Sequence, residues 1–143
     1  MVSVISPERW KIWCERHQLP VAESLFSSST CYFGFGIRSR PGTLLVTSTQ
    51  MIHQSYSVRD TYWAMFEKPE RVVVDVSGIK SVQTVTLPLW LQIAHTTGKG
   101  ATLIEFIDGS TWELVIHEVE SEFIETVCRL TGLKILPIRR LVS

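Results

Sequence analysis

The sequence predicts an α+β protein in which a strongly curved antiparallel sheet, or a seven-stranded barrel, is closed by one helix near the end of the chain. Three observations lead to this fold class. From about residue 32, apolar residues recur with the period of two that half-buried strands require. Turn residues separate these runs. Residues 119–131 then change to helical spacing and end at Gly132, a residue suited to the left-handed end of a helix.

The last strands and the helix form the clearest stretch. Residues 101–107 and 111–117 alternate in polarity and are joined by Asp108–Gly109, a strong short hairpin signal. Acidic residues gather at the start of the helix, where the helix dipole favours negative charge. Its apolar stripe must be buried, and the preceding sheet is the one large partner that the chain offers. The stripe contains Phe123, Ile124, Val127, Cys128 and Leu130.

A second helix is predicted over residues 6–18. Ser6 suits the N-cap position, and Pro7 suits the first helical position. Trp10 and Trp13 share one face, which indicates core packing more often than partner contact.

The polar stretch from Ser27 to Thr30 is interpreted as a break before the first strand. We therefore divide the chain into an N-terminal helical extension, residues 1–30, and a main domain, residues 31–143, within a single domain overall. A length of 143 residues suits one domain.

Further strands are predicted from β-branched and aromatic runs that lie between Gly- and Pro-containing turns. The turn that precedes the second strand is placed at residues 38–42, and a break in the pattern occurs at Gly78. The expected strands cover residues 32–37, 43–47, 50–57, 72–76 with a continuation to 85, and 87–95.

Composition narrows the function. Fourteen basic residues balance fourteen acidic ones, so no nucleic-acid partner is expected, because such proteins usually carry a basic excess. The three cysteines are widely spaced, and no C-x-x-C pair occurs, which favours reduced thiols and no metal site. No apolar run approaches the ~20 residues that span a bilayer, and the start lacks the apolar core of a signal peptide. The expected compartment is the cytoplasm.

Several patterns together are similar to the GRAM and bacterial pleckstrin-homology-like domains. Gly42, Leu44 and Thr47 match a G-x-L-x-x-T pattern that follows the family's first turn, and residues 74–82 resemble its hydrophobic-x-x-I-x-x-V pattern. The hairpin and the final helix complete the match. The resemblance implies an antiparallel barrel plugged by the helix. Residues 48–50, Ser-Thr-Gln, depart from the family, which often carries a basic residue after the threonine.

The resemblance also implies a candidate site for an anionic ligand. Arg38 and Arg40 lie in the predicted turn where phosphoinositide-binding members of the wider fold place basic residues. Arginine binds phosphate through two parallel hydrogen bonds, so the chemistry suits a lipid headgroup at a membrane surface. Lys80 and Lys99 join this site if the strands bring them near. A solvated turn is the competing interpretation.

An aromatic segment is the candidate surface for partner contact. Aromatic residues and methionine are enriched at the cores of interfaces, but in strands they also extend the protein core, so both interpretations stay open. The segment contains Tyr56, Tyr62, Trp63, Met65 and Phe66.

No motif indicates catalysis. Cys14 and His17 lie one helical turn apart, but two residues do not make a zinc site. The sequence holds no nucleophile elbow, phosphate-binding loop or dinucleotide motif. We expect no catalytic residue and no cofactor. The predicted function is a non-enzymatic binding module for a protein or a second copy, through an exposed strand edge or the aromatic segment. The alternative is binding of anionic lipid through Arg38 and Arg40.

Overall fold

The computed structural model describes residues 6–35, 39–61, 64, 68–87, 100–116 and 120–140, and the structural statements below concern these residues. Eight strands form one sheet in the order β4-β3-β2-β1-β7-β6-β5-β8. The elements are α1 (Pro7–Arg16), a 3₁₀ turn (Val21–Glu23), β1 (Phe26–Phe33), β2 (Arg40–Val46), β3 (Gln50–Ser55), β4 (Arg71–Asp75), a 3₁₀ turn (Val76–Gly78), β5 (Ile79–Thr86), β6 (Gly100–Phe106), β7 (Thr111–Ile116), α3 (Glu120–Thr131) and β8 (Arg139–Arg140).

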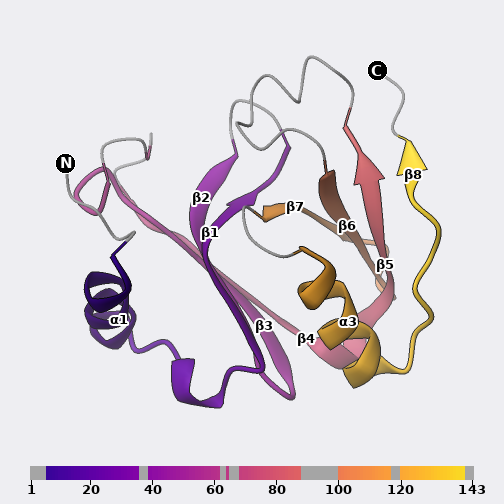
Figure 1. The fold of residues 1–143 in the computed structure, drawn as a ribbon, viewed down its shortest axis with the longest axis horizontal. Helices are drawn as coiled ribbons and strands as arrows, with labels where there is room; N and C mark the ends of the chain where they lie inside the picture. The colour runs from indigo at the N-terminus through magenta and orange to yellow at the C-terminus, as the bar shows by residue number, and fades with distance from the viewer. Residues whose placement is uncertain are drawn as a thin grey trace.

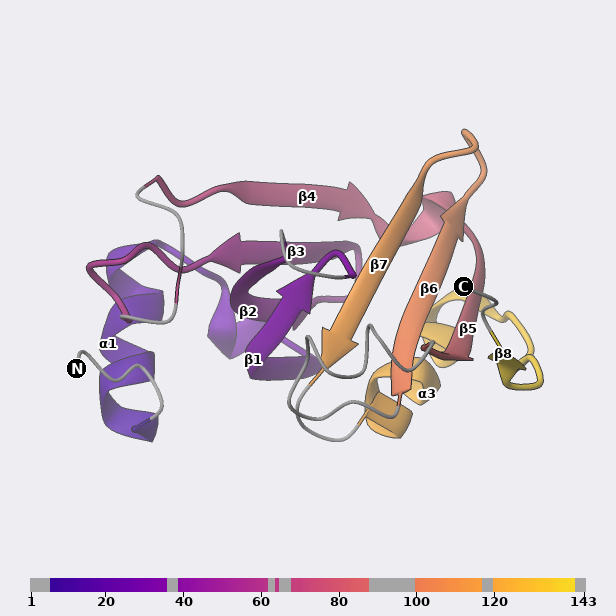
Figure 2. The same cartoon turned by 90° about the horizontal axis from the view of Figure 1, so that it is seen from above.

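The first seven strands pair with one another in the antiparallel sense, and the sheet bends so that its two halves cross. Figure 2 shows β3 and β4 running across the direction of β6 and β7. The halves join where β1 residues 31–33 pair with β7 residues 114–116. The helix α3 follows and lies in the opening between the halves (Figure 1). This is a pleckstrin-homology-like fold, so the predicted fold class is confirmed.

The main core lies between the concave side of the sheet and α3. Phe123 and Val127 are fully buried, and the Phe123 ring meets Phe26 of β1 edge-on with 5.5 Å between ring centroids. Burial of one such side chain contributes roughly 1.5–3 kcal/mol. At the start of the helix, Thr84 Oγ1 of β5 donates a hydrogen bond to Glu120 Oε1 at 2.8 Å. At its end, Gly132 takes a φ of 75°, and its N–H donates to the carbonyl of Cys128.

The helix α1 covers the opposite side of the sheet. Trp13 and Cys14 are buried against Leu45 of β2 and Ile52 of β3, so the prediction of a core tryptophan is confirmed for Trp13. In Figure 1, α1 and α3 lie on opposite sides of the sheet formed by β1 to β4. Because both faces of β2 are covered, that strand is almost continuously buried rather than alternating.

The sheet begins earlier than the sequence predicted. The stretch from Ser27 to Thr30 lies inside β1, so the boundary placed between residues 30 and 31 falls within a strand. The prediction failed here because a run of serine and threonine is typical of loops. In the structure, Ser28 is buried opposite Leu44 of β2, and its hydroxyl donates to the carbonyl of Thr30.

Two other boundaries were also wrong. The predicted turn over residues 38–42 ends too late, because β2 begins at Arg40 and its first residues pair with β1. The run of residues 72–85 is interrupted by the 3₁₀ turn Val76–Gly78, after which β4 and β5 lie far apart in the strand order. The predicted strand 87–95 lies outside the described residues apart from Leu87.

Gly42 allows β2 and β3 to approach each other closely. A Cβ atom at this position would lie 2.2 Å from the carbonyl oxygen of Gln54 and 2.7 Å from the Cα of Ser55. Both are backbone atoms of β3, which cannot rotate away as a side chain would.

We expect Gly42→Ala to lower the free energy of unfolding by at least about 2 kcal/mol, because the strands must move apart to admit the methyl group. Gly78→Ala is the matched control. No atom lies within 4 Å of its added Cβ, so its change should stay within about 0.5 kcal/mol. Urea denaturation of the three proteins measures both effects, and equal losses in the two variants would contradict the steric explanation.

Candidate binding surface

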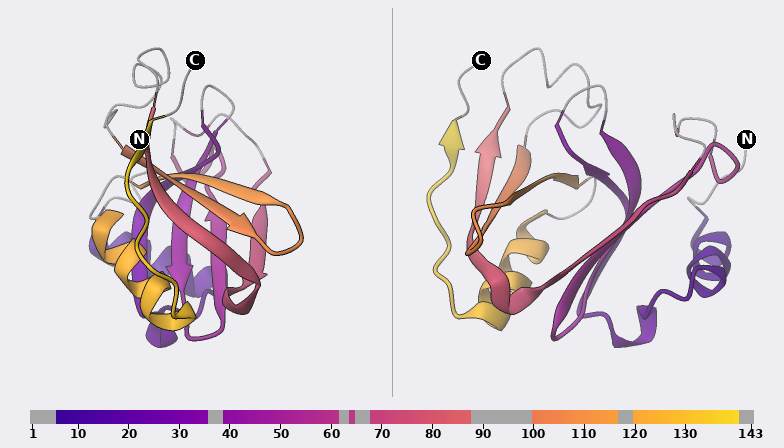
Figure 3. Two further views of the ribbon diagram at one scale, coloured as in Figure 1. Left: turned by 90° about the vertical axis from the view of Figure 1, so that its right-hand side faces the viewer. Right: turned by 180° about the vertical axis from the view of Figure 1, so that it is seen from behind.

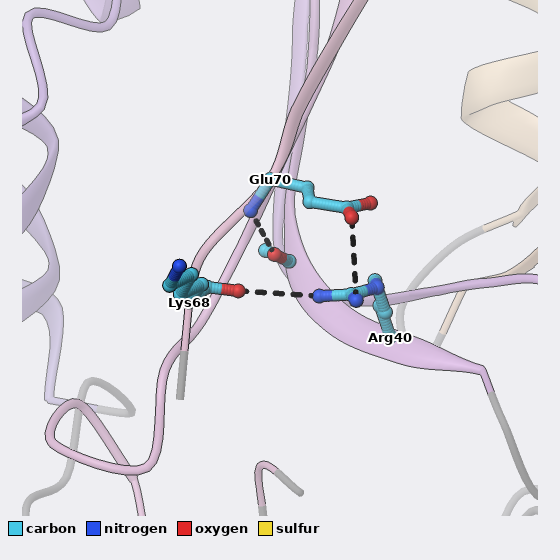
Figure 4. A network of polar contacts seen from close by, with 4 residues as sticks. Arg40, Lys68 and Glu70 are labelled. Carbon is cyan, nitrogen blue, oxygen red and sulfur yellow. Dashed lines mark hydrogen bonds and ion pairs between the residues drawn. The ribbon is translucent and has the colours of Figure 1, made fainter. Parts of the chain in front are cut away.

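Arg40 links the start of β2 to the segment that precedes β4. Its Nη1 donates to the carbonyl oxygen of Lys68 at 3.2 Å, and its Nη2 lies 3.3 Å from Glu70 Oε1 (Figure 4). The backbone N–H of Glu70 in turn donates to Ser55 Oγ at 2.7 Å. The guanidinium therefore connects the start of β2 with the residue that precedes β4, and the carboxylate of Glu70 balances its charge.

The described residues do not unite the predicted anionic site. Lys80 is exposed on β5, and three strands lie between β5 and Arg40 on β2 in the sheet order. Arg38 and Lys99 lie outside the described residues. Recognition of anionic lipid through this set stays a prediction.

Tyr56, one member of the predicted contact segment, is a core residue, which corrects that assignment. Its side chain is fully buried, and its ring packs edge-on against Trp13 with centroids 4.7 Å apart. The hydroxyl donates to the carbonyl of Ser29 and lies 2.9 Å from Thr43 Oγ1, which also accepts a 2.8 Å hydrogen bond from Trp10 Nε1. Tyr56 is buried because α1 covers this part of the chain. The other four residues, Tyr62, Trp63, Met65 and Phe66, lie outside the described residues.

The strand β4 forms one edge of the sheet. Across the part of the chain that the structure describes, it pairs only with β3. Two hydrogen bonds at the ends of β4 show which of its backbone groups face β3. They run from Ser55 N to the Glu70 carbonyl and from Val76 N to the Thr49 carbonyl. Because backbone groups alternate in direction along a strand, those of Arg71, Val73 and Asp75 point away from β3. This leaves a row of backbone donors and acceptors along the outer edge.

At the other edge, β5 is partly covered by the chain itself. We call residues 134–140 the strap, because they run beside β5 after α3, as the yellow trace in Figure 3 shows. Among the described residues the strap makes two pairs with β5, Val85 with Arg139 and Thr86 with Arg140, in the parallel sense. Gln83 Nε2 adds a hydrogen bond to the carbonyl of Pro137 at 2.7 Å.

The strap exposes unusually apolar side chains. Ile135 is 63% exposed and Ile138 is 70% exposed, with Leu136 between them at 39%. Leu133, just before the strap, packs instead against the main core. The segment is therefore held to β5 by few contacts, although its composition suits a buried environment.

Sequence reasoning named neither edge. The signal for β4 was present in Arg71-Val-Val-Val-Asp75, where charged residues flank a short β-branched run. The signal for the strap was a group of large apolar residues after Gly132, at a point where Pro137 bars a helix. Neither pattern shows which strand would be at an edge, because the strand order comes from long-range pairing.

The described residues also form two surface hollows. One, of about 330 Å³, lies beside the end of α3 and is lined by Ser48, Val76, Ser77, Ile79, Leu130 and Thr131. The other, of about 390 Å³, lies between α1 and the turn that follows it and is lined by Lys11, Glu15, Leu19, Val21 and Ala22. The first has no ionisable side chain, and the second has two of opposite charge. Within the described ranges no three potential metal ligands gather.

The buried titratable groups are held in their neutral forms. Burial raises the pKa of the Cys14 thiol to about 12, with the Glu15 carboxylate adding to the effect. Burial lowers the pKa of His53 to about 4, although the hydrogen bond from its Nε2 to the carbonyl of Cys31, at 2.8 Å, opposes the shift. A neutral imidazole must carry its proton on Nε2 to donate to that carbonyl. These groups serve the core of the fold.

Comparison with solved structures supports the fold. The C-terminal domain of an unknown protein from Leishmania infantum has a TM-score of 0.56 at 14% identity, covering 85% of this chain and 95% of that chain. The hSac2 domain from human phosphoinositide phosphatase Sac2 has a TM-score of 0.53 at 11% identity, covering 96% and 92%. The DH/PH domains of a p115-RhoGEF mutant give 0.46 at 10% identity, covering 80% and 32%, too low to support an argument. At these identities the similarity shows the fold alone.

No family model matches the chain, and no curated protein matches it. The narrower resemblance to GRAM and bacterial domains therefore stays a prediction. None of the helices that the structure describes is long and apolar enough to cross a membrane.

The histidine at position 53 predicts a pH-dependent stability. Its pKa in the folded protein, about 4, lies below the ordinary value of 6.5, so the unfolded chain takes up the proton first as the pH falls. Stability should therefore be nearly constant with respect to this group above about pH 7 and fall by about 3 kcal/mol between pH 7 and pH 4. His53→Gln, which keeps an N–H donor for Cys31, should flatten this dependence. Urea denaturation across the pH range measures the slopes, and identical slopes would exclude His53 as the cause.

Proposed function

We propose that the protein is a non-enzymatic binding module that accepts an extended segment of a partner protein as an added strand at the β5 edge. The observation that carries the proposal is the strap itself. An extended segment already lies on this edge and pairs with it through backbone groups. In such recognition the backbone hydrogen bonds provide affinity, and alternate side chains provide specificity.

Most of the β5 edge is not used by the strap. Within the part of the chain that the structure describes, the strap pairs with Val85 and Thr86, whereas β5 runs from Ile79 to Thr86. From residue 79 to residue 84, β6 is the only strand that pairs with β5 among the described residues. A longer segment that follows β5 would form more ladder hydrogen bonds than the strap forms.

Displacement of the strap costs little burial. Ile135 and Ile138 are already mostly exposed, so their removal from β5 exposes little further apolar surface, and Leu136, at 39% exposed, is the main side chain that would lose cover. Pro137 has no N–H group to donate to β5. Because Leu133 packs against the core, the boundary between the fixed and the displaceable parts of the chain lies after it.

The fold supports the general class of binding module, since its curved sheet has one edge, β4, that pairs only with β3 among the described residues and another, β5, that the strap covers only in part. The functions named for the structural neighbours belong to those proteins. The binding role proposed here rests on the strap and the β5 edge.

The test uses the strap as its own probe. A fluorescent peptide of residues 134–143 is titrated into a chain that ends at Leu133 and into the full chain, with anisotropy as the readout. We expect saturable binding to the shortened chain and at least about tenfold weaker binding to the full chain, where the tethered strap competes at high effective concentration. Circular dichroism checks that the shortened chain stays folded.

Two controls make this result specific. Gln83→Ala in the shortened chain should weaken peptide binding severalfold, because it removes the hydrogen bond to the carbonyl of Pro137. A peptide of scrambled order should not bind. If a folded shortened chain binds neither peptide, or binds both equally, the β5 edge does not accept strands in the way proposed.

A further inference from the structure

The second open edge of the sheet has a self-complementary pattern. Along β4, the residues whose backbone groups point away from β3 are Arg71, Val73 and Asp75. Their side chains share one face of the strand, and Val73 lies at the middle with 42% of its surface exposed. A positive charge therefore stands at one end of the edge and a negative charge at the other, with an exposed valine between them.

We propose that the β4 edge pairs with the β4 edge of a second copy of this chain, antiparallel and about a twofold axis at Val73. This inference concerns a different edge from the proposed function and does not rest on it.

The backbone phase matches such a pair. With Val73 opposite Val73 of the second copy, Arg71 of each copy lies opposite Asp75 of the other. All three positions are those with outward-facing N–H and C=O groups, so the register gives about six hydrogen bonds between the copies. A twofold interface uses one surface patch twice, and this patch complements itself.

The charges select the antiparallel direction. In a parallel pair at the same register, Arg71 would face Arg71 and Asp75 would face Asp75, and like charges placed directly opposite destabilise a strand pair. In the antiparallel pair every such contact joins opposite charges. The same charges would also repel an edge with a different pattern, as guarding residues do on exposed strands.

The two charged side chains are placed for this contact in different ways. Arg71 donates from Nε to Gln54 Oε1 at 2.7 Å and from Nη2 to the carbonyl of His17, so its guanidinium is held toward β3 and the end of α1. Its other N–H groups remain for an ion pair with the partner copy. Asp75 is exposed and makes no side-chain hydrogen bond or ion pair with the described residues. Its carboxylate therefore has full capacity for the partner copy.

The full chain should dimerise weakly, because five residues of strand edge form a small interface. Sedimentation velocity between about 10 µM and 1 mM should show the average mass rising toward twice that of one chain. Asp75→Arg alone and Arg71→Asp alone should each weaken this association at least about tenfold, because each places like charges opposite one another.

The decisive measurement mixes the two single variants. Asp75→Arg carries two positive charges at the edge and Arg71→Asp carries two negative ones, so a mixed pair regains both opposite-charge contacts. An equimolar mixture should associate to within about threefold of the original chain. A variant that had only lost its fold would not be rescued by mixing.

Two further variants locate the contact. Val73→Pro removes an outward N–H without removing a hydrogen bond to β3, so it should abolish dimerisation while circular dichroism stays unchanged. Glu125→Arg is the matched charge reversal on the exposed side of α3 and should leave dimerisation unchanged. A chain that stays monomeric to about 1 mM overturns the proposal and makes β4 a guarded edge. A dimer that tolerates the β4 variants, or a mixture without rescue, overturns it in favour of another interface.

Discussion

The burial of the apolar face of α3 in the concave side of the sheet is the constraint on which the rest of the structure depends. Phe123 and Val127 have no exposed surface, and they meet side chains from both crossing halves of the sheet. Without this helix the two halves would leave an open apolar trough between them. The sheet therefore has to bend, and a bent, unclosed sheet has two edges. Both candidate binding surfaces follow from this geometry.

The two edges are treated differently by the chain. The edge at β5 is covered by a short parallel strand from the strap, which satisfies a few backbone groups and leaves apolar side chains in solvent. The edge at β4 carries opposite charges at its ends. Exposed strand edges invite pairing with other chains, so folded proteins cover or charge them. Here the strap on β5 and the charges on β4 also determine which kind of segment fits each edge.

Much of the fold could be predicted from local patterns. The hairpin at Asp108–Gly109, the helix that ends at Gly132 and the buried Trp13 follow from turn chemistry, dipole preference and helical spacing, which act over a few residues. The first strand was partly missed because Ser27 to Thr30 look like a loop until a partner strand covers them. Burial of Tyr56 depends on α1, which lies more than thirty residues away in the sequence.

The candidate surfaces were harder to predict for the same reason. A strand edge is defined by the absence of a neighbour, and strand order is set by contacts between distant residues. The predicted cations show the same dependence on distant residues. Arg40 has the right chemistry for phosphate, but its guanidinium is engaged by Glu70, which lies thirty residues later in the chain. The residue type shows which ligand a side chain could bind, whereas its contacts with other residues decide whether it is still available to do so.

The hydrogen bonds that run from Trp10 through Thr43 and Tyr56 to Ser29 have one further consequence. An indole nitrogen only donates and a backbone carbonyl only accepts, so both hydroxyls between them must point the same way. The four groups thus form a chain of hydrogen bonds with a single donor direction, which begins at Trp10 on α1 and ends at Ser29 on β1. Reversal of any link would leave two donors or two acceptors face to face, so the docked position of the first helix and the conformation of the first strand are set together.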